Sequence, residues 1–110
     1  MLDARISNEQ RLSIYKRDNF RCALCDGVRS IQIHHVIPRG RGGNNSNHNL
    51  ITLCMYCHGI AHGTKWAWED GMESITQEDI ELSCVEYLSD YYAGQGEIWA
   101  PWEPGREGDW

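Results

Sequence analysis

The chain has 110 residues, 41% of them hydrophobic, and a formal net charge of −6. This length and composition are typical of one small globular domain and exclude a disordered chain. Its apolar runs are only a few residues long, and Met1 is followed closely by Asp3 and Arg5, so neither a membrane span nor a signal peptide is expected. We therefore expect a cytoplasmic protein.

Charge is distributed unevenly along the chain. Residues 1–41 carry a net charge of +4, and residues 42–110 carry −10. A basic half of this kind can bind phosphate groups while the acidic half faces away from them. Charge alone leaves an ordinary solvated surface as an equally good interpretation.

A helix and a strand are predicted in the first third of the chain. Ser7 and Gln10 fit a capping box, which predicts a helix over residues 8–18. Residues 31–37 are rich in β-branched side chains and stop at Pro38, which is typical of a strand.

The next predicted elements are short. Residues 39–48 form a polar loop rich in turn residues, and its histidine, His48, is expected at the surface. A second strand is predicted over residues 50–53. A two-turn helix over residues 54–62 should follow, with Gly63 at its end.

A longer helix is predicted near the carboxyl end. Thr76 and Asp79 fit a second capping box, and the helix should extend over residues 76–93. Apolar side chains recur at helical spacing, so this face is expected in the core, with Cys84 as an ordinary apolar position. These side chains are Ile80, Cys84, Leu88 and Tyr91.

Residues 94–110 are rich in Trp, Pro and Gly and are predicted to form a tail. Its tryptophans are expected by default to pack back on the domain, and binding of a protein partner is the alternative. The expected organisation is one domain over residues 1–93, with its motifs in residues 20–63, followed by the tail.

Four of the five cysteines form two Cys-x-x-Cys pairs, Cys22/Cys25 and Cys54/Cys57. In a compartment where thiols stay reduced, such pairs indicate zinc ligands rather than disulfides, and redox or incidental cysteines are the weaker alternatives. Two such turns bring four thiolates to one ion and complete a tetrahedral shell. The ion would staple the hairpin between the pairs, which suits a domain with a thin core.

Four histidines are placed for a second metal ion and for catalysis. His58 and His62 are four residues apart and share a face of the predicted short helix, whereas Cys57 points about 100° away. His34 on the preceding strand is a natural third ligand, and His35 is then free to act as a base. Because adjacent strand residues point to opposite faces, His34 and His35 can serve one reaction only if the phosphate lies between them or the strand bends.

These residues form an ordered series of motifs: Cys22-x-x-Cys25, His34-His35-x-x-Pro38, Gly42-Gly43, Asn49-Leu50 and Cys54-x-x-Cys57-His58. The series resembles the HNH family of metal-dependent endonucleases over residues 8–63. The resemblance implies an α+β fold of the ββα-metal (His-Me finger) type with flanking helices, here stapled by a four-cysteine zinc site. Residues 1–93 would then be an HNH nuclease domain.

The resemblance also implies roles for single residues. His35 matches the general base that activates water, Asn49 the residue that orients the loop, and His58 a metal ligand on the helix. Together with His34 and His62, the ligand set is similar to that of colicin-type nucleases, which bind their ion through three imidazoles. Zn²⁺, Ni²⁺, Co²⁺ or Mn²⁺ suits nitrogen ligands better than Mg²⁺ does.

The implied function is hydrolysis of DNA phosphodiester bonds, with double-stranded DNA as the expected substrate. His35 would take a proton from water, and one divalent ion would stabilise the charge of the transition state. Arg39 or Arg41 can hold a neighbouring phosphate, or either is a solvated loop charge. Short stand-alone proteins of this family resemble those of phages and mobile elements, and restriction or packaging roles are equally compatible with the sequence.

Two other classes of function remain open. A non-catalytic zinc module that binds DNA or protein needs only the four cysteines, but it leaves the aligned histidines unexplained. A zinc hydrolase acting on small substrates is disfavoured by the basic half and by the lack of a Glu base beside the histidines.

Overall fold

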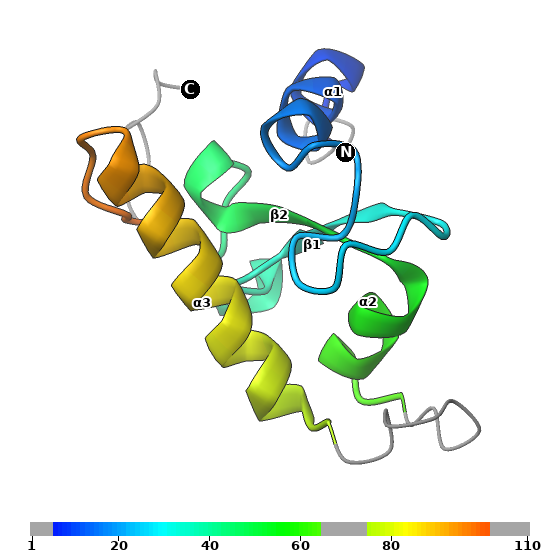
Figure 1. Cartoon of the computed structure of the whole chain (residues 1–110). Coiled ribbons are helices and arrows are strands. Elements are labelled where there is room, and N and C mark those ends of the chain that lie inside the picture. Colours follow the sequence, from blue (N-terminus) through cyan, green and yellow to red (C-terminus); the bar gives the residue numbers. More distant parts are fainter. Residues whose placement is uncertain (1–5, 65–74, 102–110) are drawn as a thin grey trace.

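Three helices surround a two-stranded antiparallel sheet in the computed structural model, which describes residues 6–64 and 75–101 (Figure 1). None of the described helices is both long and apolar enough to cross a membrane. The elements in chain order are α1 (Asn8–Arg17), β1 (Gln32–His35), the 3₁₀ turns η2 (Arg39–Arg41) and η3 (Asn47–Asn49), β2 (Leu50–Leu53), α2 (Met55–Ala61) and α3 (Gln77–Gly94).

The hairpin of β1 and β2 forms the centre of the fold. Its register pairs His34 with Ile51 and His35 with Leu50. Every residue of β2 is buried, whereas β1 buries mainly His34. The helices α1 and α2 both contact the two strands, and α3 packs against α2. The sheet is therefore the platform that positions the histidines, as the α+β prediction requires.

Capping residues determine where the helices begin. Ser7 Oγ accepts the Gln10 N–H (3.0 Å) at the start of α1. At the start of α3, Thr76 Oγ1 accepts the Asp79 N–H (3.1 Å), and the Asp79 carboxylate accepts the Thr76 N–H (2.9 Å). The predicted capping box is confirmed in α3. In α1 only the Ser7 half forms, because the Gln10 side chain donates to Asn45 and Asn47 instead.

A buried ion pair joins three elements and was not predicted. Arg17 Nε donates to Asp18 Oδ1 at 2.8 Å, and both side chains are almost fully buried. Asp18 also accepts the Thr52 N–H of β2 and the Tyr87 hydroxyl of α3, each at 2.9 Å, while Arg17 donates to the carbonyl of Leu50 (2.7 Å). Since a buried charge pair is retained only with its remaining hydrogen bonds satisfied, Arg17 is structural and does not belong to the basic surface.

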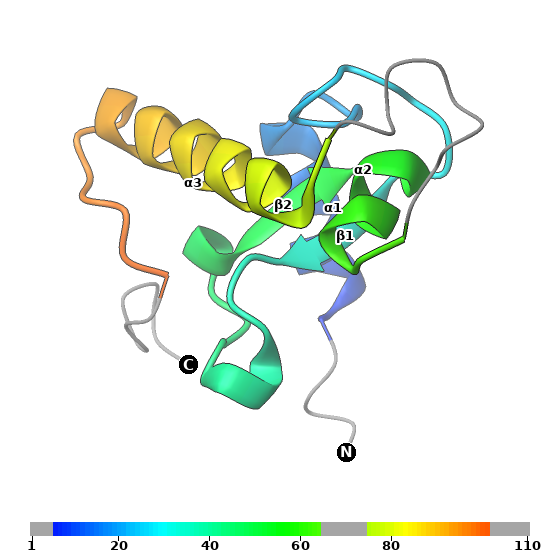
Figure 2. The same ribbon diagram turned by 90° about the horizontal axis from the view of Figure 1, so that it is seen from below.

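The loop between the strands, residues 36–49, projects from the hairpin (Figure 2). Two glycines allow its tight path. Gly42 has φ +92°, which L side chains rarely adopt, and a Cβ on Gly43 would overlap the carbonyl oxygen of Ile37. The Gly-Gly dipeptide is therefore required by the backbone of this loop.

The prediction that His48 lies at the surface is wrong. His48 is 1% exposed and stacks on Tyr92 of α3, with ring centroids 3.9 Å apart. Its Nδ1 accepts the Ala100 N–H (2.9 Å), so Nε2 carries the ring proton and donates to Glu97 (3.0 Å). Trp99 Nε1 donates to the His48 carbonyl (2.6 Å). The segment after α3 thus packs back on η3, as expected by default for Trp99. Trp102 and Trp110 lie outside the described residues.

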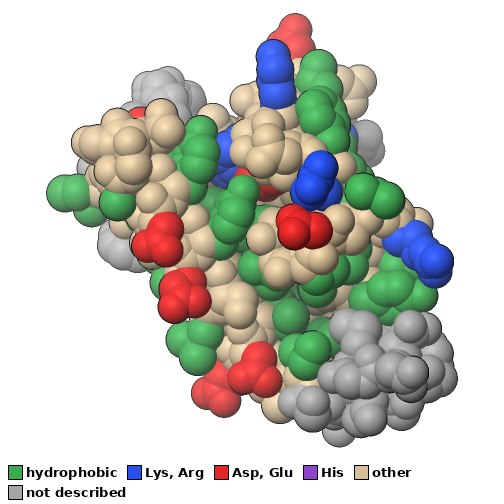
Figure 3. Space-filling model, in the orientation of Figure 1, with side chains coloured by type: hydrophobic (Ala, Val, Ile, Leu, Met, Phe, Trp, Pro, Cys, Tyr) green, Lys and Arg blue, Asp and Glu red, His purple; other side chains and the backbone are tan. Residues whose placement is uncertain are grey.

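Charge is distributed unevenly over the described structure, although some acidic side chains lie beside basic ones. In the space-filling view, acidic side chains gather along α3, and the Lys and Arg side chains in view lie over α1 and the loops beside it (Figure 3). The described residues from 75 to 101 contain no Lys or Arg. The charge asymmetry of the sequence therefore becomes a spatial asymmetry.

Candidate functional site

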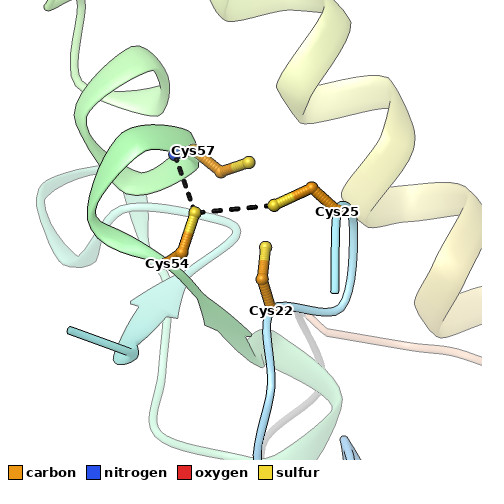
Figure 4. A group of neighbouring side chains, drawn as sticks. All are labelled: Cys22, Cys25, Cys54 and Cys57. Carbon is orange, nitrogen blue, oxygen red and sulfur yellow. Dashed lines mark hydrogen bonds between the residues drawn. The ribbon is translucent and has the colours of Figure 1, made fainter. Parts of the chain in front are cut away.

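The four paired cysteines converge on one point (Figure 4). Cys22 and Cys25 come from the loop after α1, whereas Cys54 caps α2 and Cys57 lies in its first turn. Their sulfur atoms all lie within 4.8 Å of one another, and Cys25 Sγ is 3.6 Å from Cys54 Sγ. A tetrahedral zinc ion with Zn–S bonds of about 2.3 Å separates its sulfurs by about 3.8 Å. The group could therefore hold a zinc-sized ion with little movement.

Backbone hydrogen bonds hold the first cysteine pair against the hairpin. The Cys22 N–H donates to Gly27 O (2.8 Å), and the Asp26 N–H donates to Cys22 O (3.0 Å), closing a tight turn in which Asp26 has φ +63°. The Ala23 N–H donates to Thr52 O of β2 (2.9 Å). A backbone hydrogen bond therefore anchors the turn that carries Cys22 and Cys25 to β2.

Electrostatics favour a cation among these sulfurs. A hydrogen bond with Cys57 lowers the pKa of Cys22 to about 5, and the same contact together with burial raises the pKa of Cys57. Burial also raises the pKa of Cys25 to about 11. Like charges this close cannot all form without a counter-charge, so four thiolates require a bound cation, which a divalent metal supplies.

A second group, His34, His58 and His62, could hold another metal ion. Its ligand atoms also lie within 4.8 Å of one another. The Nε2 atoms of His58 and His62 are 3.1 Å apart, close to the separation of about 3.3 Å between two nitrogens bound to one tetrahedral ion. The His34 ring is 5.1 Å from the His58 ring and 5.4 Å from the His62 ring, centroid to centroid. The structure thus brings together the three predicted imidazole ligands.

Burial lowers the pKa of two of these rings, and Gln32 of β1 orients one of them. Desolvation, with smaller effects of the nearby imidazoles, lowers the pKa of His34 to about 3, and desolvation and His62 also lower the pKa of His58. Both rings are therefore neutral at neutral pH, the form that binds metals. Gln32 Oε1 contacts His58 Nδ1. Because an amide oxygen only accepts, His58 carries its proton on Nδ1 and directs the Nε2 lone pair toward the other rings.

The side chain of His35 is not part of the three-imidazole group and is held by the loop. Its Nε2 lies 2.8 Å from Asn45 Oδ1. Arg39 Nη1 donates to the same oxygen (3.4 Å). An oxygen cannot donate, so His35 Nε2 is the donor and its Nδ1 carries the lone pair. The hydrogen bond to Asn45 thereby fixes the orientation of the His35 ring and of its Nδ1 atom.

Asn49 connects the end of β1 with the loop. It is fully buried, and its Oδ1 accepts the Ile37 N–H (2.8 Å). Its Nδ2 donates to the carbonyls of Ile37 (3.1 Å) and Asn44 (2.9 Å). These three bonds hold both flanks of the loop next to His35 and leave no side-chain atom of Asn49 free to contact a substrate.

One pocket of about 350 Å³ contains most of the predicted site. His34 and His35 both line it, so neighbouring strand residues reach a common cavity even though their side chains alternate. The arginines of η2 also line it, as do two residues of α3 that sequence reasoning did not single out. The predicted lining residues are His34, His35, Arg39, Arg41, His58 and His62, and the additional ones include Gln77 and Glu81.

The same segment matches a known family. The family model of the HNH endonucleases covers residues 21–64. Residues 21–64 form an HNH domain. This HNH domain contains both cysteine pairs, the three-imidazole group, His35 and Asn49, and it ends before α3.

Two curated proteins are similar to part of this chain. The chain is 41% identical over 46 residues to the type IV methyl-directed restriction enzyme EcoKMcrA of Escherichia coli (strain K12), and 37% identical over 46 residues to anaredoxin of Nostoc sp. (strain PCC 7120 / SAG 25.82 / UTEX 2576). These matches cover 42% and 41% of this chain, but 17% and 60% of the two relatives. The likeness therefore concerns less than half of this chain and less than two thirds of either relative. A comparison with solved structures found no significant match.

Besides Gln77, three contributors to the site were missed by sequence reasoning. Gln32 could have been found, because strand residues two apart share a face and Gln32 lies two before His34. Asn45 lies in an Asn-rich loop where nothing distinguishes it from Asn44. Glu81 reaches the pocket only because α3 packs across it, and helical periodicity within α3 does not reveal that contact.

Proposed function

We propose that the chain is a metal-dependent endonuclease that hydrolyses phosphodiester bonds of double-stranded DNA. The observation that carries the proposal is the composition of the 350 Å³ pocket. An oriented imidazole, a three-imidazole group suited to a divalent ion and two arginines, all from the HNH domain, line one cavity. Base, metal ligands and phosphate-binding charge are the groups that phosphodiester hydrolysis requires.

In the proposed mechanism His35 acts as the general base. Its Nδ1, left free by the hydrogen bond from Nε2 to Asn45, takes a proton from the water that attacks phosphorus. Asn49 is a positioning residue that holds the backbone on both sides of the loop carrying Asn45. A divalent ion bound by His34, His58 and His62 would stabilise the negative charge of the transition state and of the departing 3′ oxygen.

The four-cysteine group is proposed to hold a structural zinc ion. All four positions of a tetrahedral shell are taken by protein sulfurs, so no position is open for water or substrate, which is typical of structural sites. The two metal groups therefore have separate roles, although α2 contributes ligands to both.

A plasmid-nicking assay tests the proposed function. Supercoiled plasmid should be converted to open-circular or linear DNA when Zn²⁺, Ni²⁺, Co²⁺, Mn²⁺ or Mg²⁺ is supplied, and excess chelator should stop the reaction. The His58→Ala variant is the matched control for contaminating nuclease, because it removes a ligand but leaves the four cysteines intact. If the wild-type protein cuts DNA with none of these ions yet still binds it, the non-catalytic zinc module is the better description.

Arg39 and Arg41 are proposed to bind phosphates beside the cleaved bond. Both are exposed on η2 and line the pocket. Replacing both with alanine should weaken binding to every DNA sequence about equally and should reduce the slope of log K against log salt concentration by about 2, because each phosphate contact releases close to one counterion. Arg29→Ala, an exposed arginine outside the pocket, is the control. A loss of affinity confined to one DNA sequence would show instead that these arginines contact bases.

A further inference from the structure

We propose that an apolar pocket beside the catalytic one receives an unstacked nucleobase from the nucleotide next to the cleaved phosphate. The pocket lies between residues 36–41 and α3 and has a volume of about 400 Å³. This inference rests on the proposed nuclease function, since it deepens the description of how that site binds its substrate. It concerns α3 and the segment after it, which lie outside the HNH domain.

The walls of this second pocket suit a flat, weakly polar ligand. Most of them are apolar, and a volume of this size with few polar groups is typical of sites for small organic ligands. Trp99 is a fixed part of the wall, because its indole nitrogen donates to the His48 carbonyl. The apolar lining residues are Val36, Ile37, Pro38, Leu82, Val85 and Pro101.

The two pockets are adjacent. Val36, Pro38, Arg41 and Glu81 line both of them. A DNA strand whose phosphate lies between His35 and the three-imidazole group therefore has its neighbouring sugar and base within reach of the apolar pocket. The base is also the only part of a nucleotide with an extended apolar face, and stacking of bases on apolar or aromatic side chains is a common mode of strand binding.

The carboxylates at the second pocket favour binding of a nucleobase over binding of a phosphate. Glu78 and Glu81 line it together with Arg41. Two carboxylates repel a phosphate, but they accept hydrogen bonds from the exocyclic amino groups of cytosine, adenine and guanine. Thymine lacks such a group and should bind more weakly. Arg41, which lines both pockets, is placed to hold the phosphate that joins them.

A nucleotide titration tests the pocket without any cleavage. The full-length zinc-loaded protein, ¹⁵N-labelled, is titrated with deoxycytidine 5′-monophosphate and, separately, with deoxyribose 5-phosphate, which lacks the base. The nucleotide should shift the amides of Leu82 and Val85 and bind about tenfold more tightly than the sugar phosphate, the size expected for one stacked base. Thymidine 5′-monophosphate should bind less tightly than the cytidine nucleotide.

Two exposed leucines provide the variant and its control. Leu82 is 65% exposed and lines the pocket, whereas Leu12 on α1 is 56% exposed and does not line it. Leu82→Ala should remove most of the tenfold advantage of the nucleotide without changing the affinity for deoxyribose 5-phosphate, and Leu12→Ala should change neither. Exposed positions such as these have small effects on folding.

Several outcomes would overturn the inference. One is equal affinity for the nucleotide and the sugar phosphate, and another is a set of shifted amides confined to the loop around His35. Concentration-dependent shifts of Leu82 and Val85 without nucleotide would mean that a second copy of the chain fills the pocket. The plasmid-nicking assay is separate. Nicking without nucleotide binding in this pocket refutes the pocket alone, whereas nucleotide binding without nicking refutes the nuclease proposal alone.

Discussion

Replacing His35 with alanine is expected to slow DNA nicking by about 10² to 10⁴-fold, the usual effect of losing a general base. Only the rate should change, because His35 and the proposed metal ligands are different residues of the pocket. His35 Nε2 and Arg39 Nη1 both donate to Asn45 Oδ1. His35 is not a member of the three-imidazole group. The variant should therefore fold, bind metal and bind DNA like the wild type. Nicking rates under single-turnover conditions measure the loss.

A ligand variant should behave differently from the base variant. His58→Ala removes one of three imidazoles and should weaken binding of the second metal ion, which calorimetry measures directly. His35→Ala should leave that affinity unchanged, and its activity should recover in part at high pH, where hydroxide replaces the base. If His35→Ala nicks DNA as fast as the wild type, His35 is not the base.

Local sequence signals predicted most of the elements that carry the site. The strand over residues 50–53 and the helix over residues 54–62 correspond to β2 and to α2 with its two capping residues. Both have strong local determinants, namely β-branched residues in the strand and Gly63, with φ +92°, after the helix. The first strand is shorter than predicted, Gln32–His35 rather than residues 31–37. Its last residues instead enter the loop that Asn49 holds.

The contribution of α2 to both metal-ligand groups was predictable, because it follows from helix geometry over a few residues. Cys57 and His58 are adjacent on α2, and 3.6 residues per turn direct adjacent side chains about 100° apart. The helix therefore presents sulfur to one group and imidazole to the other, as the sequence predicted. This division of side chains depends on the local conformation of α2 alone, whereas Cys22, Cys25 and His34 reach the two groups through tertiary packing.

Contacts between distant segments could not be predicted in the same way. His48 is buried only because Ala100 and Glu97, about fifty residues later, return to its ring. Arg17 and Asp18 are adjacent charged residues at the end of α1, and nothing local distinguishes them from solvated charges. Their burial depends on Tyr87 of α3 and on the backbone of β2. In each case the decisive partner lies more than thirty residues away.

Replacing Cys54 with serine is expected to release the structural metal and to abolish cooperative unfolding. Cys54 is 2% exposed, caps α2 and ends the strand β2, so its sulfur joins the hairpin to the helix that carries His58 and His62. Structural zinc contributes about 10–16 kcal/mol of apparent binding free energy, whereas small domains are stable by about 5–15 kcal/mol in total. Loss of the ion is therefore enough to unfold the domain. Elemental analysis and urea unfolding followed by circular dichroism measure the two effects.

The fifth cysteine supplies the matched control for this experiment. Cys84 is as buried as Cys54, at 1% exposure, but it lies on α3 and outside the four-cysteine group. Cys84→Ala should retain one zinc ion per chain and a cooperative transition, with only the modest destabilisation of a small cavity. The two metal groups share α2, so Cys54→Ser should also lose binding of the second ion at the three imidazoles. A Cys54→Ser protein that lacks zinc and still unfolds cooperatively would contradict the structural role of this ion.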